Sequence, residues 1–204
     1  MSFIETLSLD DAEDAVREMY ERQQGAWGYV PNYAKSFSHR PEVMACWGQL
    51  LAELRRPMDA RTFEMITFAA AHELRNTSCS LAHGNKLTEF FGNEDICAIA
   101  EDRPVDSVSE AEREMMSFAR KVARDASAIE LADVERLKKH GFSDADVFDI
   151  AATVAGRAFF TKVLDAVGSL PDSAFMSIDK EIRDPLTVGR SIDTAAVEVM
   201  KNIG

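Results

Sequence analysis

Apolar side chains recur every three to four residues along most of this chain, which is the spacing of amphipathic helices. Alternating runs of Val, Ile and Thr between turn residues, which would predict strands, are absent. Pro41 and Asp59 suit the start of helices, and Ser109 and Ser143 each stand three residues before an acidic residue, as in a capping box. The pattern predicts an all-α protein, with helices over about 9–24, 41–54, 60–75, 78–91, 94–101, 109–125, 131–140 and 143–167.

The helical pattern weakens after Pro171. The rest of the chain carries Pro185 and ends in a short amphipathic segment over 194–200. No linker rich in Pro, Gly or Ser interrupts the earlier helices. We therefore expect one helical domain over 1–170 and a C-terminal arm over 171–204, packed on the body or on a neighbouring subunit.

Composition narrows the classes of function. Of the 204 residues, 46% are hydrophobic, which is enough for a sizeable core, and the formal net charge is -12, from 35 acidic and 23 basic residues. This balance disfavours nucleic acid and anionic membranes as partners, because proteins bind phosphate largely through Lys and Arg. No apolar stretch approaches the ~20 residues that span a bilayer. We therefore expect neither a nucleic acid nor a membrane as partner.

The number and spacing of the cysteines indicate the cellular compartment. Cys46, Cys79 and Cys97 are odd in number and widely spaced, and Cys46 and Cys97 occupy apolar helical positions that predict burial in the core. The N-terminal residues contain no basic region followed by an apolar run, so we expect no secretory signal. Together these features predict a reducing, cytoplasmic location.

Residues 76–84, Asn-Thr-Ser-Cys-Ser-Leu-Ala-His-Gly, combine several reactive side chains. A helix over this segment places Cys79 and His83 on one face, one turn apart, and Asn76 suits its N-cap. A cysteine in a first helical turn lies at the positive end of the helix dipole, which favours the thiolate. Glu64, in the preceding apolar helix, could supply a carboxylate. If buried, its raised pKa would make it a proton acceptor near neutral pH.

Each of these residues also has an ordinary structural interpretation. A free cysteine is most often a small buried apolar residue, and Glu64 could pair with Arg61 on the helix surface. A zinc site that combines His72 and Glu73 with Cys79 and His83 is not expected, because no second cysteine completes a compact set of ligands. We predict no metal and no cofactor. The chain also lacks a dinucleotide-binding glycine motif, a P-loop and a G-x-S-x-G motif.

The spacing of Glu64, Cys79 and His83 resembles that of the alkylhydroperoxidase D and carboxymuconolactone decarboxylase superfamily. Members with peroxidase activity carry a glutamate helix followed by C-x-x-C-x-x-x-H at the start of the next helix. Cys79 matches the second cysteine of that motif and His83 its histidine, whereas Asn76 occupies the position of the first cysteine.

The likeness extends along the chain. Residues 28–32 (Gly-Tyr-Val-Pro-Asn) and 40–42 (Arg-Pro-Glu) look like N-terminal elements of the family, and 118–144 resembles its helix-turn-helix after the active site. The resemblance covers about 9–170 and is nearest to the peroxidase-related branch. It implies a multi-helix alkylhydroperoxidase D-like bundle that forms homo-oligomers, as trimers or hexamers, with active sites near the subunit contacts.

The resemblance also implies the chemistry of a thiol peroxidase, a peroxiredoxin-type antioxidant oxidoreductase. Cys79 would attack a small hydroperoxide and become a sulfenic acid, with His83 and Glu64 as the proton relay. Because Asn76 replaces the partner cysteine, a vicinal disulfide cannot form there. An external thiol, or another cysteine of the chain, would have to reduce the oxidised site. We therefore expect a one-cysteine cycle.

Two alternatives stay open at this point. The other arm of the superfamily suggests a decarboxylase-like lyase on a small acid or lactone, in which His83 and Glu64 do acid–base work and Cys79 is a bystander. The net charge of -12 is unfavourable for an anionic substrate, although a local arginine such as Arg75 could offset it. The second alternative is a non-catalytic helical assembly protein in which Cys79 is merely buried.

Overall fold

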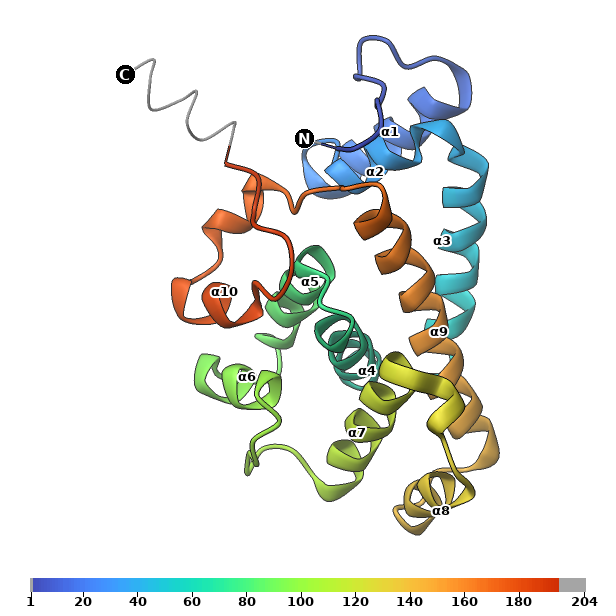
Figure 1. Ribbon diagram of the computed structural model, residues 1–204, viewed down its shortest axis with the longest axis vertical. Coiled ribbons are helices and arrows are strands. Elements are labelled where there is room, and N and C mark those ends of the chain that lie inside the picture. The colour runs from blue at the N-terminus through green and yellow to red at the C-terminus, as the bar shows by residue number, and fades with distance from the viewer. Residues whose placement is uncertain (1, 195–204) are drawn as a thin grey trace.

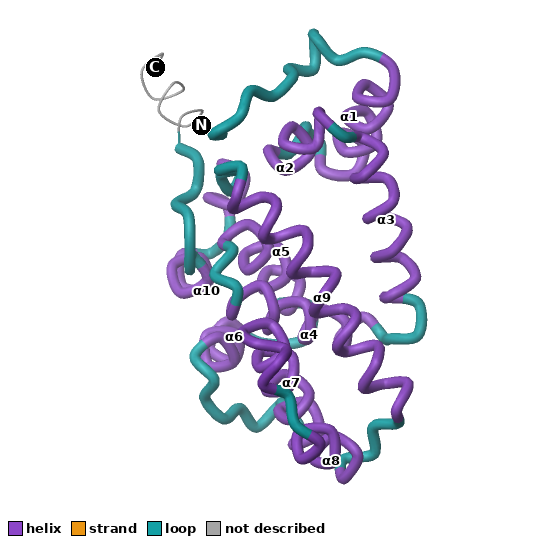
Figure 2. The backbone as a smooth tube through the Cα atoms, turned by 45° about the vertical axis from the view of Figure 1, so that its right-hand side comes forward, coloured by secondary structure: helices purple, strands orange, loops and turns teal. Residues whose placement is uncertain are grey.

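A computed structural model describes residues 2–194, and every regular element among them is helical (Figures 1 and 2). The predicted all-α fold is therefore confirmed. The helices are α1 (Asp14–Trp27), α2 (Asn32–Ser36), α3 (Pro41–Arg55), α4 (Ala60–Glu73), α5 (Thr77–Leu87), α6 (Asn93–Ala100), α7 (Glu110–Asp125), α8 (Leu131–Lys139), α9 (Asp144–Ala166) and α10 (Lys180–Leu186), with short 3-10 turns at Phe37–His39, Ala126–Ala128 and Ser173–Ser177. Among the described residues, no helix is long and apolar enough to cross a membrane. The amphipathic segment expected over 194–200 lies, beyond Thr194, outside the described residues.

Polar caps begin several helices where the sequence predicts them. The Asp59 carboxylate accepts a hydrogen bond from the backbone N–H of Thr62 at 2.8 Å, and α4 follows directly. Ser109 and Ser143 each form a complete capping box at the start of α7 and α9. Pro41 is the first residue of α3. Each cap satisfies backbone donors that have no partner inside the helix, which contributes about 1 kcal/mol to stability.

Some boundaries differ from the prediction. Helix α1 begins at Asp14 rather than near residue 9, and it continues through Gly25. Gly28 ends it in the left-handed conformation, with φ of 80°, and its N–H donates to the Gln24 carbonyl at 2.8 Å. Helices α2 and α10 were not predicted, because five and seven residues are too few to display a helical period.

Helix α4 is the central element of the fold (Figure 1). It packs against α5, α7 and α9, and α3 lies along α9 on the outer side. Residues 63–71 of α4 are all buried, which is possible only because neighbours cover this helix on every side. Helix α10 packs on α5 and α6, so residues after Pro171 return to the body of the molecule. This arrangement places α4, α5 and α9 side by side, with the predicted reactive residues between them.

Gly84 permits the close approach of α10 to α5. A Cβ atom at this position would lie 2.2 Å from Leu186 Cδ1 and 3.2 Å from Phe68 Cε2. We expect Gly84→Ala to lower the free energy of unfolding by about 1–3 kcal/mol, because the buried Leu186 must shift within a packed core. Chemical denaturation measures this change.

Gly48→Ala on α3 is the matched control. Nothing lies within 4 Å of a Cβ atom at Gly48, so the same substitution should stabilise that helix by about 0.5–1 kcal/mol. Equal effects at both positions would contradict the close contact at Gly84.

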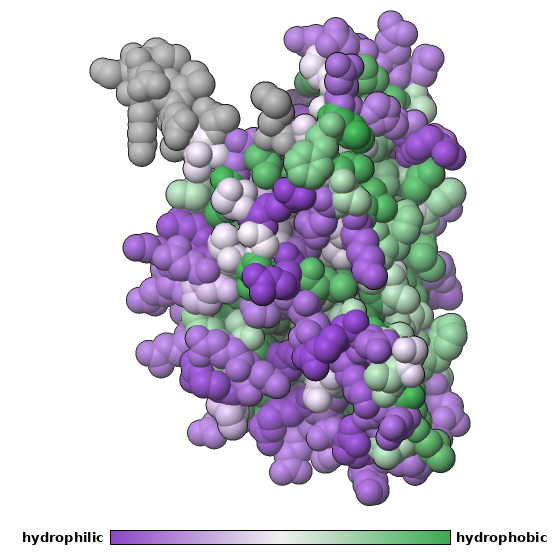
Figure 3. Space-filling view, in the orientation of Figure 1, coloured by the Kyte–Doolittle hydropathy of each residue, from purple (hydrophilic) through white to green (hydrophobic). Residues whose placement is uncertain are grey.

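Large apolar side chains are exposed on both α3 and α9. Leu50 on α3 and Phe148 and Phe159 on α9 are exposed. The space-filling view in Figure 3 shows apolar colour concentrated along the edge formed by these two helices, whereas polar side chains cover much of the rest of that face.

Candidate active site

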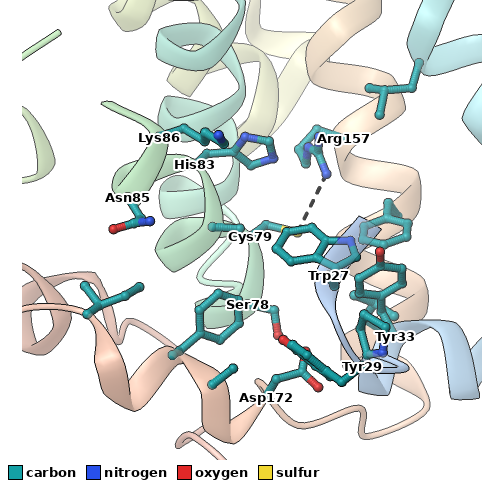
Figure 4. Close-up of a pocket in the computed structure, with 18 of the residues that line it drawn as sticks. Trp27, Tyr29, Tyr33, Ser78, Cys79, His83, Asn85, Lys86, Arg157 and Asp172 are labelled. Atoms are coloured by element: carbon teal, nitrogen blue, oxygen red, sulfur yellow. Dashed lines mark hydrogen bonds between the residues drawn. The ribbon is translucent and has the colours of Figure 1, made fainter. Parts of the chain in front are cut away.

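A pocket of about 500 Å³ opens beside the first turns of α5. Its walls come from α1, α2, α3, α4, α5 and α9, from the turn between α1 and α2, and from the segment that follows α9 (Figure 4). Most of the lining residues are apolar or aromatic, and the aromatic ones are Trp27, Tyr29, Tyr33, Trp47, Phe160 and Phe175. The polar side chains in the lining include Glu64, Cys79, His83, Arg157 and Asp172. The three residues predicted from the sequence, Glu64, Cys79 and His83, therefore line one cavity.

Glu64 and His83 form a directly hydrogen-bonded pair. His83 Nδ1 lies 2.6 Å from Glu64 Oε2, and both side chains are largely buried. Burial tends to raise the pKa of Glu64, but the hydrogen bond and charge of His83, with the charges of Arg55 and Arg157, outweigh it and lower that pKa. The acid is thus a carboxylate. The expectation that burial would raise its pKa is wrong, because it gains a partner in His83. The alternative partner Arg61 instead binds Glu112.

The protonation of His83 follows from its surroundings. Burial lowers the pKa of His83, the Arg157 cation lowers it further, and Glu64 raises it only in part. The imidazole is therefore neutral near pH 7. Because a carboxylate can only accept a hydrogen bond, the proton lies on Nδ1 and the lone pair on Nε2. His83 is left with one nitrogen that can accept a proton.

Cys79 lies in the first turn of α5, as predicted. Its backbone N–H donates to Asn76 Oδ1 at 2.9 Å, so Asn76 is the N-cap of the helix. The side chain is only 4% exposed, and this burial raises the pKa of the Cys79 thiol, although the nearby Arg157 opposes the shift. The helix terminus was expected to favour the thiolate. In the structure the pKa of Cys79 is instead raised by burial, so the resting residue is a thiol.

Asn76 has a structural role at the position of the missing cysteine. It caps α5 through its carbonyl oxygen and also hydrogen-bonds the side chain of Asp165, whose pKa burial raises. The neighbouring Thr77 hydroxyl accepts a hydrogen bond from the N–H of Gly189 at 2.8 Å, which ties the C-terminal segment to the same helix start. The first turn of α5 is thus held from two directions.

Arg157 is a pocket residue that the sequence analysis missed. It is 3% exposed, and its Nη1 lies 3.7 Å from Cys79 Sγ (Figure 4). Its guanidinium also lies 5.4 Å from the ring centre of Trp47 and 5.8 Å from that of Phe160. An arginine in the middle of the apolar run over 154–160 was the available signal. The suggested cation, Arg75, does not line the pocket.

The other two cysteines lie elsewhere. Cys46 is exposed on α3 and Cys97 is partly exposed on α6, so the expectation that both belong to the core is wrong. Neither lines the pocket. His72 also lies outside its lining, and Glu73 pairs with Arg124. In the part of the chain that the structure describes, no group of three or more His, Cys, Asp and Glu side chains could hold a metal ion.

Solved structures with the same fold include two peroxidase-related proteins. One, from Ralstonia eutropha JMP134, is described as an alkylhydroperoxidase AhpD core. It is 26% identical, covers 85% of this chain and 94% of its own, and has a TM-score of 0.69. The other, an uncharacterized peroxidase-related protein from Silicibacter sp. TM1040, is 24% identical, covers 86% and 94%, and has a TM-score of 0.72.

A third similar structure is an enzyme with a different activity. The debrominase Bmp8, as a cysteine-to-alanine variant in complex with 2,3,4-tribromopyrrole, is 16% identical, covers 88% of this chain and 95% of its own, and has a TM-score of 0.71. No protein-family model matches the sequence, and no curated protein matches it. The neighbours agree with the resemblance seen in the sequence: this chain has the helical fold of the alkylhydroperoxidase AhpD core, a fold that also includes a debrominase.

Proposed function

We propose that this protein is a one-cysteine thiol peroxidase, an antioxidant enzyme that reduces organic hydroperoxides. The observation that carries the proposal is that Cys79 and the hydrogen-bonded pair of Glu64 and His83 line the same pocket. The thiol must lose its proton before it can react. A neutral imidazole that a carboxylate holds in position lies in the same pocket, and this is how enzymes pair a nucleophile with its base. The peroxidase-related neighbours support the same chemistry.

In the proposed reaction, His83 Nε2 takes the proton of the Cys79 thiol, directly or through a water molecule. The thiolate sulfur then attacks the terminal oxygen of the hydroperoxide, so an S–O bond forms and the O–O bond breaks. The leaving oxygen receives the proton from His83. The products are the sulfenic acid of Cys79 and an alcohol. Glu64 holds the imidazole in position and stabilises its charge while it carries the proton.

Two thiol molecules complete the cycle. The first attacks the sulfenic acid, which releases water and forms a mixed disulfide with Cys79, and the second releases Cys79 as thiol. We propose an external thiol as reductant, because Asn76 cannot form a disulfide and neither Cys46 nor Cys97 lines the pocket. The aromatic lining and the volume of about 500 Å³ favour hydroperoxides with an apolar body.

We also propose a homo-oligomer, a trimer or hexamer. The exposed side chains of Leu50, Phe148 and Phe159 support it, because an apolar surface along two helices is typical of a subunit contact. A cytoplasmic location is proposed as well. Its support is that all three cysteines are free.

A decarboxylase-like lyase is the second candidate function. The pair of Glu64 and His83 could perform acid–base chemistry without the sulfur, and Arg157 supplies the local positive charge that an anionic substrate needs. The lyase hypothesis differs from the peroxidase hypothesis in a testable way, because a lyase of this kind does not need Cys79.

Trapping of the sulfenic acid tests the peroxidase. Mild treatment with cumene hydroperoxide in the presence of dimedone is expected to label Cys79 faster than Cys46, as read by mass spectrometry. Unspecific oxidation would give the opposite order, because Cys46 is exposed and Cys79 is buried. Labelling that is confined to Cys46 would therefore contradict the proposal.

A further inference from the structure

Arg157 is a buried cation without an anionic partner. Among the described residues, the guanidinium makes one hydrogen bond, the 3.7 Å contact with the neutral Cys79 thiol, and its Nε has no partner. The similarly buried Arg120 contrasts with it, because Arg120 donates to the Asp102 carboxylate and to the Ile99 carbonyl, both at 2.7 Å. Burial of an unpaired charge is costly. The missing partner of Arg157 is therefore a charge that arrives with a ligand or develops during a reaction.

The charge of Glu64 is felt by Arg157, but neither of the carboxylates that line the pocket forms an ion pair or a hydrogen bond with it. Glu64 binds His83 at 2.6 Å. The Asp172 carboxylate accepts a hydrogen bond from the backbone N–H of Asn32 at 2.8 Å, and Figure 4 shows it at the end of the pocket opposite Arg157. Both of these carboxylates have other partners within the protein.

The position of the guanidinium is fixed relative to the sulfur. Trp47 and Phe160, whose rings stack with centres 4.2 Å apart, both lie within cation–π distance of Arg157. The Trp47 indole also donates to the carbonyl of Gly156 at 3.2 Å, which anchors it to the same helix. Because Nη1 lies 3.7 Å from Cys79 Sγ, a molecule that reacts at the sulfur comes within hydrogen-bonding reach of this guanidinium.

We propose that Arg157 is a catalytic residue that donates hydrogen bonds to the peroxide oxygens and stabilises the one that leaves when Cys79 attacks. The inference rests on the proposed peroxidase function and deepens it. As the S–O bond forms and the O–O bond breaks, negative charge moves from the sulfur to the leaving oxygen, which then takes the proton from His83. A fixed cation beside both atoms stabilises that charge throughout the transfer.

Other charged or titratable groups also face the sulfur. They are Asp165 on α9 and Tyr33 on α2, besides Glu64 and His83 in the pocket lining. The Arg157 cation opposes the rise that burial causes in the pKa of Cys79, so its removal also leaves less thiolate. The experiment must therefore separate the amount of thiolate from the stabilisation of the leaving oxygen.

A ratio of two rate constants makes this separation. Both cumene hydroperoxide and iodoacetamide react with the Cys79 thiolate, so the ratio of their rate constants at one pH does not depend on the thiolate fraction. Iodide is a weakly basic leaving group that needs no hydrogen bond, whereas an alkoxide needs one. We expect Arg157→Met to lower the ratio of the rate constant with cumene hydroperoxide to that with iodoacetamide by about 10²–10³-fold.

Two further variants accompany it. Arg157→Lys should restore part of the ratio, because lysine keeps the charge and loses the planar fork of donors. Arg56→Gln, which removes an exposed arginine paired with Glu53 outside the pocket, should leave the ratio unchanged. Thermal melting is measured for all three. A folded Arg157→Met protein with an unchanged ratio would overturn the catalytic role, and so would an unchanged ratio in Arg157→Lys if the Met variant does not fold.

Failure of the peroxidase proposal looks different from failure of this inference. If the Cys79→Ser protein still consumes peroxide, the proposed function is wrong and no role of Arg157 at the sulfur follows. If Cys79→Ser is inactive while Arg157→Met keeps the wild-type ratio, the peroxidase stands and Arg157 has no part in the oxygen transfer.

Discussion

Replacing Cys79 by serine is expected to reduce the consumption of cumene hydroperoxide, with a small thiol as reductant, to the rate of the thiol alone. A serine hydroxyl at this site cannot supply the thiolate that attacks the O–O bond, and no sulfenic acid can form. Peroxide loss is followed directly, at several concentrations of the reducing thiol. The substitution removes one sulfur atom from a packed site, so the fold should survive, which circular dichroism checks.

Cys46→Ser and Cys97→Ser are the matched controls for this result. Both cysteines lie outside the pocket lining, on α3 and α6, so each control should retain most of the activity. A large loss in Cys97→Ser, with Cys79 intact, would point to a second cysteine in the cycle and would contradict the one-cysteine mechanism.

The same variant decides between the two candidate enzymes. A lyase that uses Glu64 and His83 for acid–base work should keep its activity in Cys79→Ser and lose it in His83→Ala. The peroxidase should lose activity in both. The third possibility is the non-catalytic assembly protein. In that case neither substitution alters any measured turnover, and Cys79 reacts slowly with iodoacetamide at every pH.

The sequence predicts the long helices because their ends carry strong local signals. Asp59, Ser109 and Ser143 bind backbone N–H groups a few residues away, and such contacts depend little on the rest of the fold. Helix α10 could not be predicted in the same way, because its seven residues are stabilised by burial of Ile182 and Leu186 against distant helices. Tertiary packing, which leaves no local pattern, forms this element.

The same difference between local signals and tertiary packing applies to the candidate site. Cys79 and His83 lie one turn apart on one helix, so their proximity follows from spacing, and the family resemblance points to Glu64. Arg157 is 78 residues from Cys79 in the chain, and the two meet only because α5 and α9 both pack against α4. The thiol pKa depends on the same packing, because the burial that raises it is a property of the assembled core. Local sequence therefore predicts the reactive groups and misses the electrostatics that act on them.

Replacing His83 by alanine is expected to lower the rate of peroxide reduction by about 10²–10⁴-fold at pH 7, because the thiol loses its base and the leaving oxygen its acid. The pH profile gives a sharper result than the rate alone. Burial and the Arg157 cation lower the pKa of His83, so the acidic limb of the wild-type profile should lie below about pH 6.5, the ordinary value for histidine. In His83→Ala that limb should vanish, and the remaining rate should rise with pH through the raised pKa of Cys79.

Glu64→Gln tests the direction of the same coupling. The Glu64 carboxylate raises the pKa of His83, so its neutral isostere should move the acidic limb to still lower pH while the plateau rate falls, since the base becomes weaker. His140→Ala, which removes an exposed histidine of the same chain, is the control and should leave both limb and plateau in place. An acidic limb that moves to higher pH in Glu64→Gln would contradict the pairing of a charged carboxylate with a neutral imidazole, and with it the proton relay on which the proposed reaction depends.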